Sequence, residues 1–451
     1  MSVRALHTAF RTGRRNPVEV LEERLPLIAP WQERTHLFVE WNVERAIKAA
    51  EASWKRYRDG TFRSEWDGVL VGLKDLIDVE GQATTAGSGV RLDHRAVADA
   101  AVTRRLREGG ALYQLGKLNL HEFAYGPTGS SSYFGPVGNP WAPDRMAGGS
   151  SSGSAAAVAS GLMWGALGTD TGGSIRIPAA LSGISGLKPT YGAISTEGVV
   201  PLSWSLDHVG PMARTVADVQ SLWGLLTGRA PVERPMRRPR VYWPQASQIV
   251  CYDPALDAYL QDAIAQILES LDAEVIRGPL IDLEEIWLAQ SIIIGSEALS
   301  YHWQSLNDRA GDYQPDVRER LAQGGAHLAV EYLAALRWRQ ETSRRYDAWF
   351  QSYDWMVLPT VPVLAPYHTD TAIRNPEGAI EDVRAVLTRF TAPFNFLGLP
   401  ALSLPFGRLH GLPVGIQLVA PRGHDDLLLA WGEDIQTRFP DSTAIPPGGL
   451  A

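Results

Sequence analysis

The sequence predicts an α/β protein built as one large domain. Short apolar runs that read as strands alternate with helical patterns along the whole chain, which is typical of α/β folds. Hydrophobic residues make up 45% and charged residues 20% of the 451 residues, an ordinary balance for a globular protein. Because no long flexible linker separates the two halves, one domain is favoured over the two or three that the length alone allows.

Four segments divide this domain, with expected boundaries at 1–60, 61–228, 229–240 and 241–451. The first reads as helical: Val18, Leu21 and Leu25 fall at helical spacing until Pro26 interrupts them. The third, RAPVERPMRRPR, reads as an exposed connection. Strands are expected at 69–79, 111–120, 241–243 and 354–363 and in PALSLPF and GIQLVA near the end, and helices after Ala98 and at 154–160, 254–272, 329–350 and from His424.

Composition excludes several classes of function. A net charge of -8 argues against a nucleic-acid footprint, which needs a clustered basic surface. Cys251 is the only cysteine, so neither an intrachain disulfide nor a cysteine-based zinc site can form. Polar residues interrupt the N-terminus before an apolar signal region, and no apolar stretch approaches about 20 residues. We therefore expect a cytoplasmic protein that does not associate with membranes.

The densest motif lies at 148–192 and reads GGSSSGSAAAVASGLMWGALGTDTGGSIRIPAALSGISGLKPTYG. Composition alone allows a flexible Gly/Ser loop. A phosphate cradle would need a following Gly-Lys-Ser/Thr, which is missing. An esterase-type elbow would make Ser151 the nucleophile, but its preceding strand is poor. Ser185 and Lys188 form an S-x-x-K pair without its companion motifs. The histidines available to an elbow are His208, His302, His327, His368, His410 and His424.

The full set of motifs resembles the amidase signature family of serine amidases. Its elements occur in order: VGLKDLIDV, TTAGS, GKLNLHEFAYG, GPVGNPW, GGSSSGSAAAVASG, GTDTGGSIRIPA, GLKPTYG, SLDHVGPMART, APFNFLGLPALSLP and GLPVGIQLVAP. The resemblance implies a mixed β-sheet core covered by helices on both faces. It also implies a nucleophile at Ser174, a bridging Ser150 held by a cis peptide, and a base at Lys74. Ser152 departs from the family, which usually has glycine there, and is expected to tighten the loop.

Elementary chemistry explains how serine and lysine side chains alone can activate a nucleophile. A serine hydroxyl needs a base beside it. Lysine can be that base only when neutral, and burial lowers its pKa from about 10.4. Lys74 follows the apolar run VLVGL, and alternation along a strand places Asp75 on the opposite face. A hydroxyl both donates and accepts, so Ser150 can relay the proton.

Other residues of the predicted site have supporting roles. Backbone N–H groups of Thr171, Gly172, Gly173 and Ser174 are expected to form the oxyanion hole, since glycines remove steric bulk. We expect Tyr125 to line the acyl pocket. Asp170 and Arg176 are predicted to form a supporting ion pair, and His121 and Glu122 are interpreted as structural.

The resulting hypothesis is an amidase that cleaves a small carboxylic amide through an acyl-enzyme on Ser174, without metal or cofactor. Three alternatives stay open: the catalytic subunit of a glutamine-dependent aminoacyl-tRNA amidotransferase, a carboxybiuret/allophanate-type hydrolase, and a catalytically silent scaffold. The amidotransferase group usually has glutamine where this chain has Ile177. The expected partner is a small amide, with no nucleic acid and no membrane. A homodimer is one of the assembly states left open.

Overall fold

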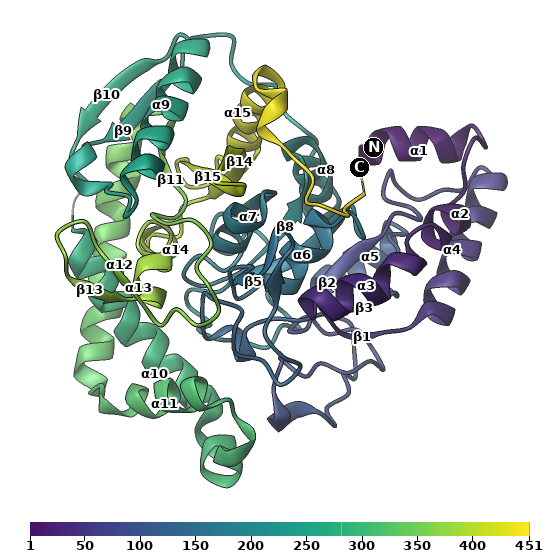
Figure 1. Ribbon diagram of the computed structural model, residues 1–451, viewed down its shortest axis with the longest axis horizontal. Coiled ribbons are helices and arrows are strands. Elements are labelled where there is room, and N and C mark those ends of the chain that lie inside the picture. The colour runs from purple at the N-terminus through teal and green to yellow at the C-terminus, as the bar shows by residue number, and fades with distance from the viewer. Residues whose placement is uncertain (281, 451) are drawn as a thin grey trace.

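An eleven-stranded mixed sheet forms the centre of the computed structural model, which describes residues 1–280 and 282–450 (Figure 1). The strands follow the order β1-β3-β2-β6-β8-β7-β14-β15-β11-β9-β10. Their bounds are β1 Phe38–Trp41, β2 Val71–Lys74, β3 Gly116–Leu118, β6 Gly165–Asp170, β7 Ser185–Lys188, β8 His208–Ala213, β9 Arg240–Pro244, β10 Glu274–Gly278, β11 Trp355–Pro359, β14 Ala401–Leu409 and β15 Leu412–Val419. Two small sheets pair β4 (Gly138–Asn139) with β5 (Ala142–Met146) and β12 (Ala372–Arg374) with β13 (Ile380–Asp382).

The direction of pairing confirms a mixed sheet. β2 runs parallel to both β3 and β6, and β9 runs parallel to β10 and β11. The strands between them pair antiparallel. Leu402 of β14 lies opposite Leu187 of β7, so one continuous sheet joins the first and second halves of the chain. The fold is therefore a single α/β domain, as predicted.

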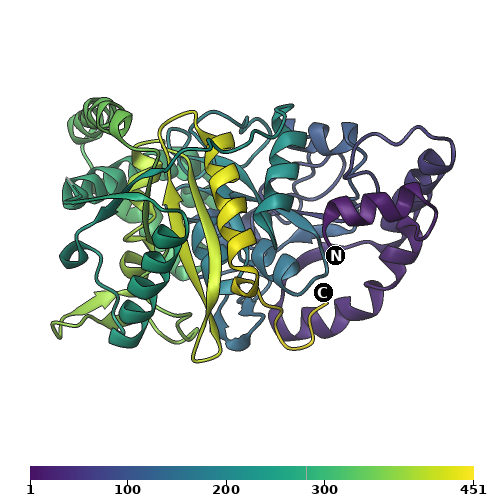
Figure 2. The same cartoon turned by 90° about the horizontal axis from the view of Figure 1, so that it is seen from above.

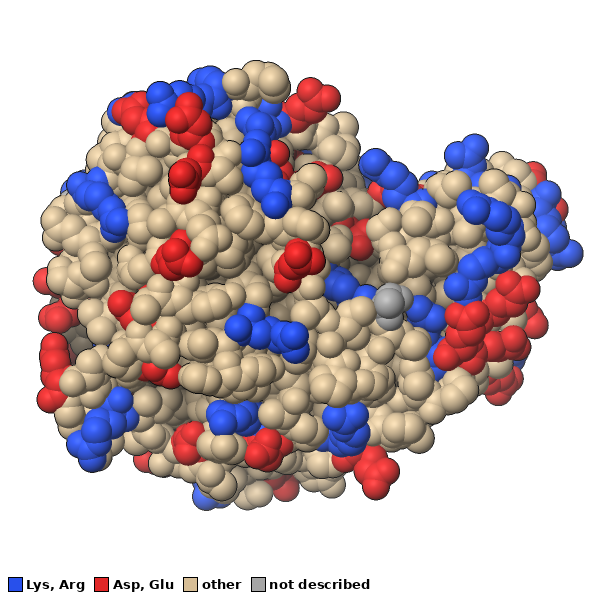
Figure 3. All heavy atoms as spheres, turned by 45° about the horizontal axis from the view of Figure 1, so that its top comes forward, with Lys and Arg blue, Asp and Glu red and all other residues tan. Residues whose placement is uncertain are grey.

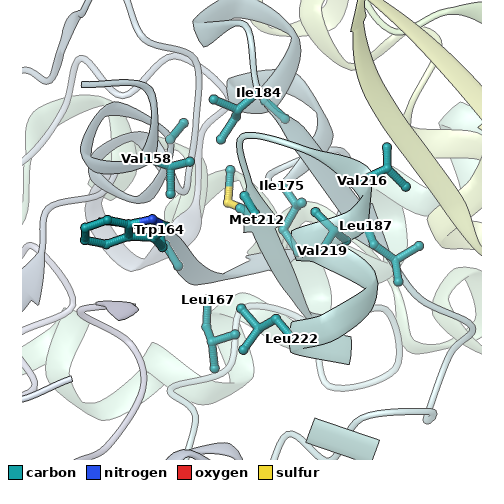
Figure 4. Packing of buried hydrophobic residues seen from close by; sticks show 14 of the residues in the cluster. Val158, Trp164, Leu167, Ile175, Ile184, Leu187, Met212, Val216, Val219 and Leu222 are labelled. Atoms are coloured by element: carbon teal, nitrogen blue, oxygen red, sulfur yellow. The ribbon is translucent and has the colours of Figure 1, made fainter. Parts of the chain in front are cut away.

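Helices cover both faces of the sheet. α6 and α7 pack together against one face, and α8 and α15 pack together against the other. Figure 4 shows side chains from these layers meeting around Met212 of β8. The helices are α1 Val3–Arg11, α2 Pro17–Glu22, α3 Leu25–Thr35, α4 Val43–Arg58, α5 Ala101–Glu108, α6 Ser152–Ala159, α7 Arg176–Ser182, α8 Val216–Thr227, α9 Pro254–Ser270, α10 Leu283–Arg309, α11 Pro315–Gln323, α12 Ala329–Trp349, α13 Val383–Thr388, α14 Ala392–Phe396 and α15 Asp425–Arg438.

One local expectation needs correction, and one long helix was not predicted. The break in the N-terminal helical segment falls before Pro26, which lies in the first turn of α3, where proline costs little because its missing N–H has no partner there. The long helix α10 is not evident from periodicity. Its β-branched run Ile292–Ile294 favours a strand locally, and packing against α12 and α14 prevails.

The two ends of the chain lie side by side (Figure 2), and Leu450 N–H donates to Ser160 O at 2.9 Å. On the face in Figure 3, basic and acidic side chains are interspersed. Across the described residues, none of the helices combines the length and the apolar character that a membrane span requires.

Candidate active site

Three chain segments bring Lys74, Ser150 and Ser174 to one end of the sheet. Lys74 is the last residue of β2, whose parallel neighbour β6 ends at Asp170. Ser150 comes two residues before α6, and Ser174 two residues before α7. Carboxyl ends of parallel strands with helix starts beside them form the usual ligand crevice of α/β sheets. The structure joins Lys74 to Ser150 by a hydrogen bond, and the Ser151 N–H donates to Ser174 O at 3.1 Å, so the three predicted residues lie at the same end of the sheet.

Lys74 is fully buried and hydrogen-bonded to two hydroxyls. Its Nζ lies 2.8 Å from Ser150 Oγ and 2.7 Å from Thr169 Oγ1. Burial lowers the pKa of Lys74 to about 7, although the carboxylates of Asp170 and Asp207 act to raise it. Burial therefore favours the neutral amine, which is the form of lysine that can accept a proton.

Asp75 directly follows β2, and its carboxylate pairs with residues other than Lys74. Its Oδ1 is 3.0 Å from Lys117 Nζ, and its Oδ2 accepts hydrogen bonds from both the N–H and the hydroxyl of Thr85. This pairing directs the Asp75 carboxylate away from Lys74.

The Gly/Ser run at 148–154 is wholly buried, which argues against the exposed flexible loop that composition alone allows. The peptide bond between Gly149 and Ser150 is cis, as the family resemblance implied. A Cβ at Gly153 would come within 2.5 Å of Leu37 O and 2.6 Å of Asn119 O, so only glycine fits there. Ser152, the departure from the family, packs its Oγ against Gly129, whose lack of a side chain makes room for it.

Asp170 and Arg176 form a fully buried ion pair that anchors the nucleophile loop. Arg176 Nη2 lies 3.0 Å from Asp170 Oδ1 and Nε lies 3.1 Å from Oδ2. Burial alone would raise the pKa of Asp170, but Arg176 holds it well below its ordinary value. The carboxylate also accepts the N–H groups of Gly173 at 2.8 Å and Ile175 at 3.0 Å. The predicted ion pair is confirmed, and it fixes the backbone on both sides of Ser174.

Two residues of the site were not predicted, Thr169 and Asp207. Asp207 Oδ1 accepts the Thr171 hydroxyl at 2.5 Å, and its carboxylate also accepts the N–H groups of Leu202 and Ser203. Burial raises the pKa of Asp207 to about 6. Both residues lie in motifs of the family pattern, Thr169 in GTDTGG and Asp207 in SLDHVG. The motifs alone do not indicate what these two side chains do.

A cavity of about 400 Å³ adjoins the nucleophile loop at Gly172. We call it the Tyr125 cavity. Tyr125, itself buried, forms part of its wall, so the structure places this predicted pocket residue beside the loop. Most of the lining surface is apolar, and the polar side chains that reach it include Gln290, Arg320, Gln323, His327, Asp382, Arg384 and Thr388. These side chains come from α10, α11, α13 and their connections.

The serines of the two alternative motifs, Ser151 and Ser185, bond to groups that cannot act as a base. Ser151 Oγ donates to Thr169 O at 3.1 Å and accepts from Thr169 N at 3.2 Å, fully buried. Ser185 Oγ accepts from Gln436, while Lys188 Nζ donates to Pro189 O and contacts His208 Nε2. Among the contacts of the described residues, neither serine hydroxyl pairs with a histidine or lysine.

His121 and Glu122 also have structural partners. His121 Nε2 lies 3.3 Å from Asp316 Oδ2, and Glu122 Oε2 accepts the Gln314 N–H at 2.8 Å. These contacts attach the 121–125 turn to α11 and its preceding segment. The 1–280 and 282–450 ranges contain no cluster of three or more His, Cys, Asp or Glu side chains arranged to hold a metal ion.

Comparison with known proteins identifies the family of this chain. The family model described as Amidase matches residues 19–429. The chain belongs to the amidase signature family. Its members among the comparisons act on carbon–nitrogen bonds, and this amidase is accordingly a hydrolase.

Specific relatives span almost the whole amidase. A glutamyl-tRNA(Gln) amidotransferase subunit of Chloroflexus aggregans is 34% identical, covering 98% of both chains. AtzE, the 1-carboxybiuret hydrolase subunit of Pseudomonas sp. (strain ADP), is 33% identical over 94% of this chain and 96% of its own. A solved amidase structure superposes with a TM-score of 0.89 at 35% identity, covering 97% of this amidase and all of that chain.

Proposed function

We propose that this amidase hydrolyses a small carboxylic amide through an acyl-enzyme on Ser174, with Ser150 and Lys74 as proton relay. The single observation that carries the proposal is the 2.8 Å hydrogen bond from a fully buried Lys74 to Ser150 Oγ, at the end of the strand beside the nucleophile loop. A neutral amine in hydrogen-bond reach of a serine is the arrangement that general-base activation needs.

The chemistry proceeds in two halves. The Ser174 hydroxyl attacks the amide carbon while its proton passes to Ser150, whose own proton passes to Lys74. The relay then returns a proton to the leaving nitrogen, the carbon–nitrogen bond breaks, and ammonia or an amine departs. Water attacks the resulting ester through the same relay, which releases the carboxylate and restores Ser174.

Backbone amides of the nucleophile loop are the proposed oxyanion donors. Since Gly173 N–H already donates to Asp170, this amide orders the loop, and the amides of Thr171, Gly172 and Ser174 are left to meet the oxyanion. Each such donor is worth about 3–4 kcal/mol in the barrier. Gly172 lines the Tyr125 cavity, so the donors and the acyl pocket would meet there.

Variants of two serines and of Lys74 test the assignment. Ser174→Ala and Lys74→Ala should each lower kcat/KM for amide hydrolysis by at least about 10⁴-fold near pH 7. Ser151→Ala serves as the matched serine control and should retain activity. An inactive Ser151→Ala protein combined with an active Ser174→Ala protein would show that the nucleophile-elbow interpretation is correct.

A substrate screen separates the remaining alternatives. Aliphatic, aryl and urea-type amides are incubated with the isolated chain, ammonia release is measured, and Ser174→Ala is the blank. An amidotransferase subunit should instead show glutaminase activity that depends on partner subunits. A silent scaffold should fail both to release ammonia and to react with a fluorophosphonate at Ser174.

A further inference from the structure

The carbonyl of Asp170, directly before the nucleophile loop, accepts hydrogen bonds from two buried side chains. His208 Nδ1 lies 3.0 Å from Asp170 O, and Asn395 Nδ2 donates to the same oxygen at 2.9 Å. The peptide bond that follows Asp170 is trans, and in a trans peptide the C=O and the N–H point in opposite directions. Its N–H belongs to Thr171, one of the proposed oxyanion donors, and therefore points away from His208 and Asn395.

A buried lysine lies behind His208. Lys188, the last residue of β7, is fully buried, and its Nζ lies 3.3 Å from His208 Nε2 and 2.8 Å from Pro189 O. Burial, and then the charge of Arg176, holds the pKa of Lys188 well below its ordinary value, and burial does the same to the pKa of His208. The interior therefore favours the neutral form of both groups.

The partners determine where the hydrogens of these groups lie. A carbonyl oxygen only accepts, so the His208 nitrogen that faces Asp170 O carries the hydrogen. Nε2 of the neutral ring is then an acceptor, and the neutral amine of Lys188 has two N–H groups for its two acceptors, His208 Nε2 and Pro189 O. The hydrogen bonds thus run in one direction, from Lys188 through His208 to the Asp170 carbonyl.

A chain of hydrogen bonds that ends on a peptide carbonyl strengthens the N–H of that peptide. Each buried hydrogen bond polarises the next by about 10–30%. A donor at the C=O draws electron density toward the oxygen, which makes the N–H on the other side of the peptide a better donor. Because this gain grows as negative charge develops opposite the N–H, it stabilises the transition state more than the bound amide.

We propose that His208 and Lys188 are positioning residues for the oxyanion hole: they hold and polarise the Asp170–Thr171 peptide, so that Thr171 N–H donates more strongly to the developing oxyanion. Within the described part of the chain, neither side chain hydrogen-bonds to a residue of the proposed relay, so both act through the peptide and not as a base. This inference rests on the proposed function, of which it extends the account of the oxyanion hole.

A fluorophosphonate that labels Ser174 measures this effect without a known substrate, because its phosphoryl oxygen enters the oxyanion hole. His208→Leu removes the donor, and the maximal labelling rate should fall about tenfold while the half-saturating concentration changes less than about twofold. His208→Gln keeps a side-chain N–H and should retain most of the rate. Lys188→Met leaves His208 in place but removes the donor behind it, so the rate should fall about threefold.

The pH dependence of labelling separates polarisation from disorder of the loop. The carboxylates that act on Lys74, those of Asp170 and Asp207, stay in place in these variants, so the midpoint of the rise with pH should match that of the wild type. A loosened loop would instead disturb the contact between Lys74 and Thr169, the residue before Asp170, and would move the midpoint.

His302→Leu is the matched control. His302 is a buried histidine whose Nδ1 lies 3.0 Å from the Tyr313 hydroxyl, and the structure gives it no hydrogen bond to the nucleophile loop. Its labelling rate should stay within about twofold of the wild-type rate. The Tm of every variant is measured alongside, so that the rate refers to folded protein.

Three results would overturn the proposal while leaving the amidase function intact. The first is a wild-type labelling rate in His208→Leu or, where that protein does not fold, in Lys188→Met. The second is a His208→Gln protein as slow as His208→Leu, and the third is a shifted midpoint in the slow variants. Loss of the proposed function is distinguishable from all three, since the wild-type protein would then neither label at Ser174 nor release ammonia from any amide.

Discussion

Thr171 Oγ1 donates a hydrogen bond of 2.5 Å to Asp207 Oδ1, which joins the nucleophile loop to the segment that precedes β8. The same carboxylate acts on Lys74 through space, raising its pKa against the effect of burial. Asp207 is thus placed both to position the loop and to adjust the base.

Asp207→Asn should shift the acidic limb of the kcat/KM–pH profile to lower pH. Asparagine keeps an oxygen for the Thr171 hydroxyl but removes the negative charge that raises the pKa of Lys74, so that pKa should fall. Asp425→Asn is the control, because Asp425 is a buried carboxylate that anchors Thr190 and does not act on Lys74. An unchanged limb in Asp207→Asn would show that its charge does not reach the base.

In the wild-type protein, amide hydrolysis should rise with pH through about 7. Below that pH Lys74 is an ammonium and cannot accept the relayed proton, whereas above it the amine is free. The check is kcat/KM measured from pH 5 to 9 with one amide at constant ionic strength. A profile that falls across this range would contradict a lysine base.

Arg176→Met should destabilise the fold by about 3–5 kcal/mol, since it leaves the buried Asp170 carboxylate unpaired. It also removes hydrogen bonds of 2.6 Å to Gln417 and Asn395. Urea unfolding measures the difference. Arg104→Met, which breaks an exposed pair with Glu197, should leave the midpoint nearly unchanged. Equal effects of the two variants would show that the buried pair is not a main anchor.

Gly173→Ala should lower kcat by about 10²-fold or more, because the loop must move away from its oxyanion-binding position. A Cβ at Gly173 would lie 2.2 Å from Thr391 Oγ1, and the residue has a φ of +134. Titration with a fluorophosphonate would report whether Ser174 still reacts. Gly311→Ala, where a Cβ meets open space, is the matched control and should behave as wild type.

Site residues that stand in sequence motifs could be predicted, whereas contacts between distant segments of the chain could not. Lys74, Ser150 and Ser174 stand in motifs whose order resembles the amidase signature family, and that resemblance supplied their expected roles. The Lys74–Thr169 contact joins residues 95 positions apart at the ends of two parallel strands, and pattern alone does not show which strands are neighbours. The same holds for the cavity, whose walls come from α10, α11 and α13.

In the fold, too, local elements could be predicted from sequence but their long-range pairing could not. Strand β14 was predicted from its own apolar run, but its pairing with β7 depends on long-range packing. Helix α10 was obscured because Ile292–Ile294 has local strand preference, and only tertiary contacts with α12 and α14 decide its state.

The β7–β14 pairing has a mechanical consequence for catalysis. A continuous hydrogen-bonded sheet crosses from the half that holds Ser174 to the half that contributes the cavity helices, so the halves cannot open about a hinge without breaking strand pairs. Admission of substrate and release of product must therefore depend on segments outside the sheet, such as α11 and the β12–β13 hairpin with α13. Amide exchange should be faster in those segments than in the paired strands, and turnover should follow their motion.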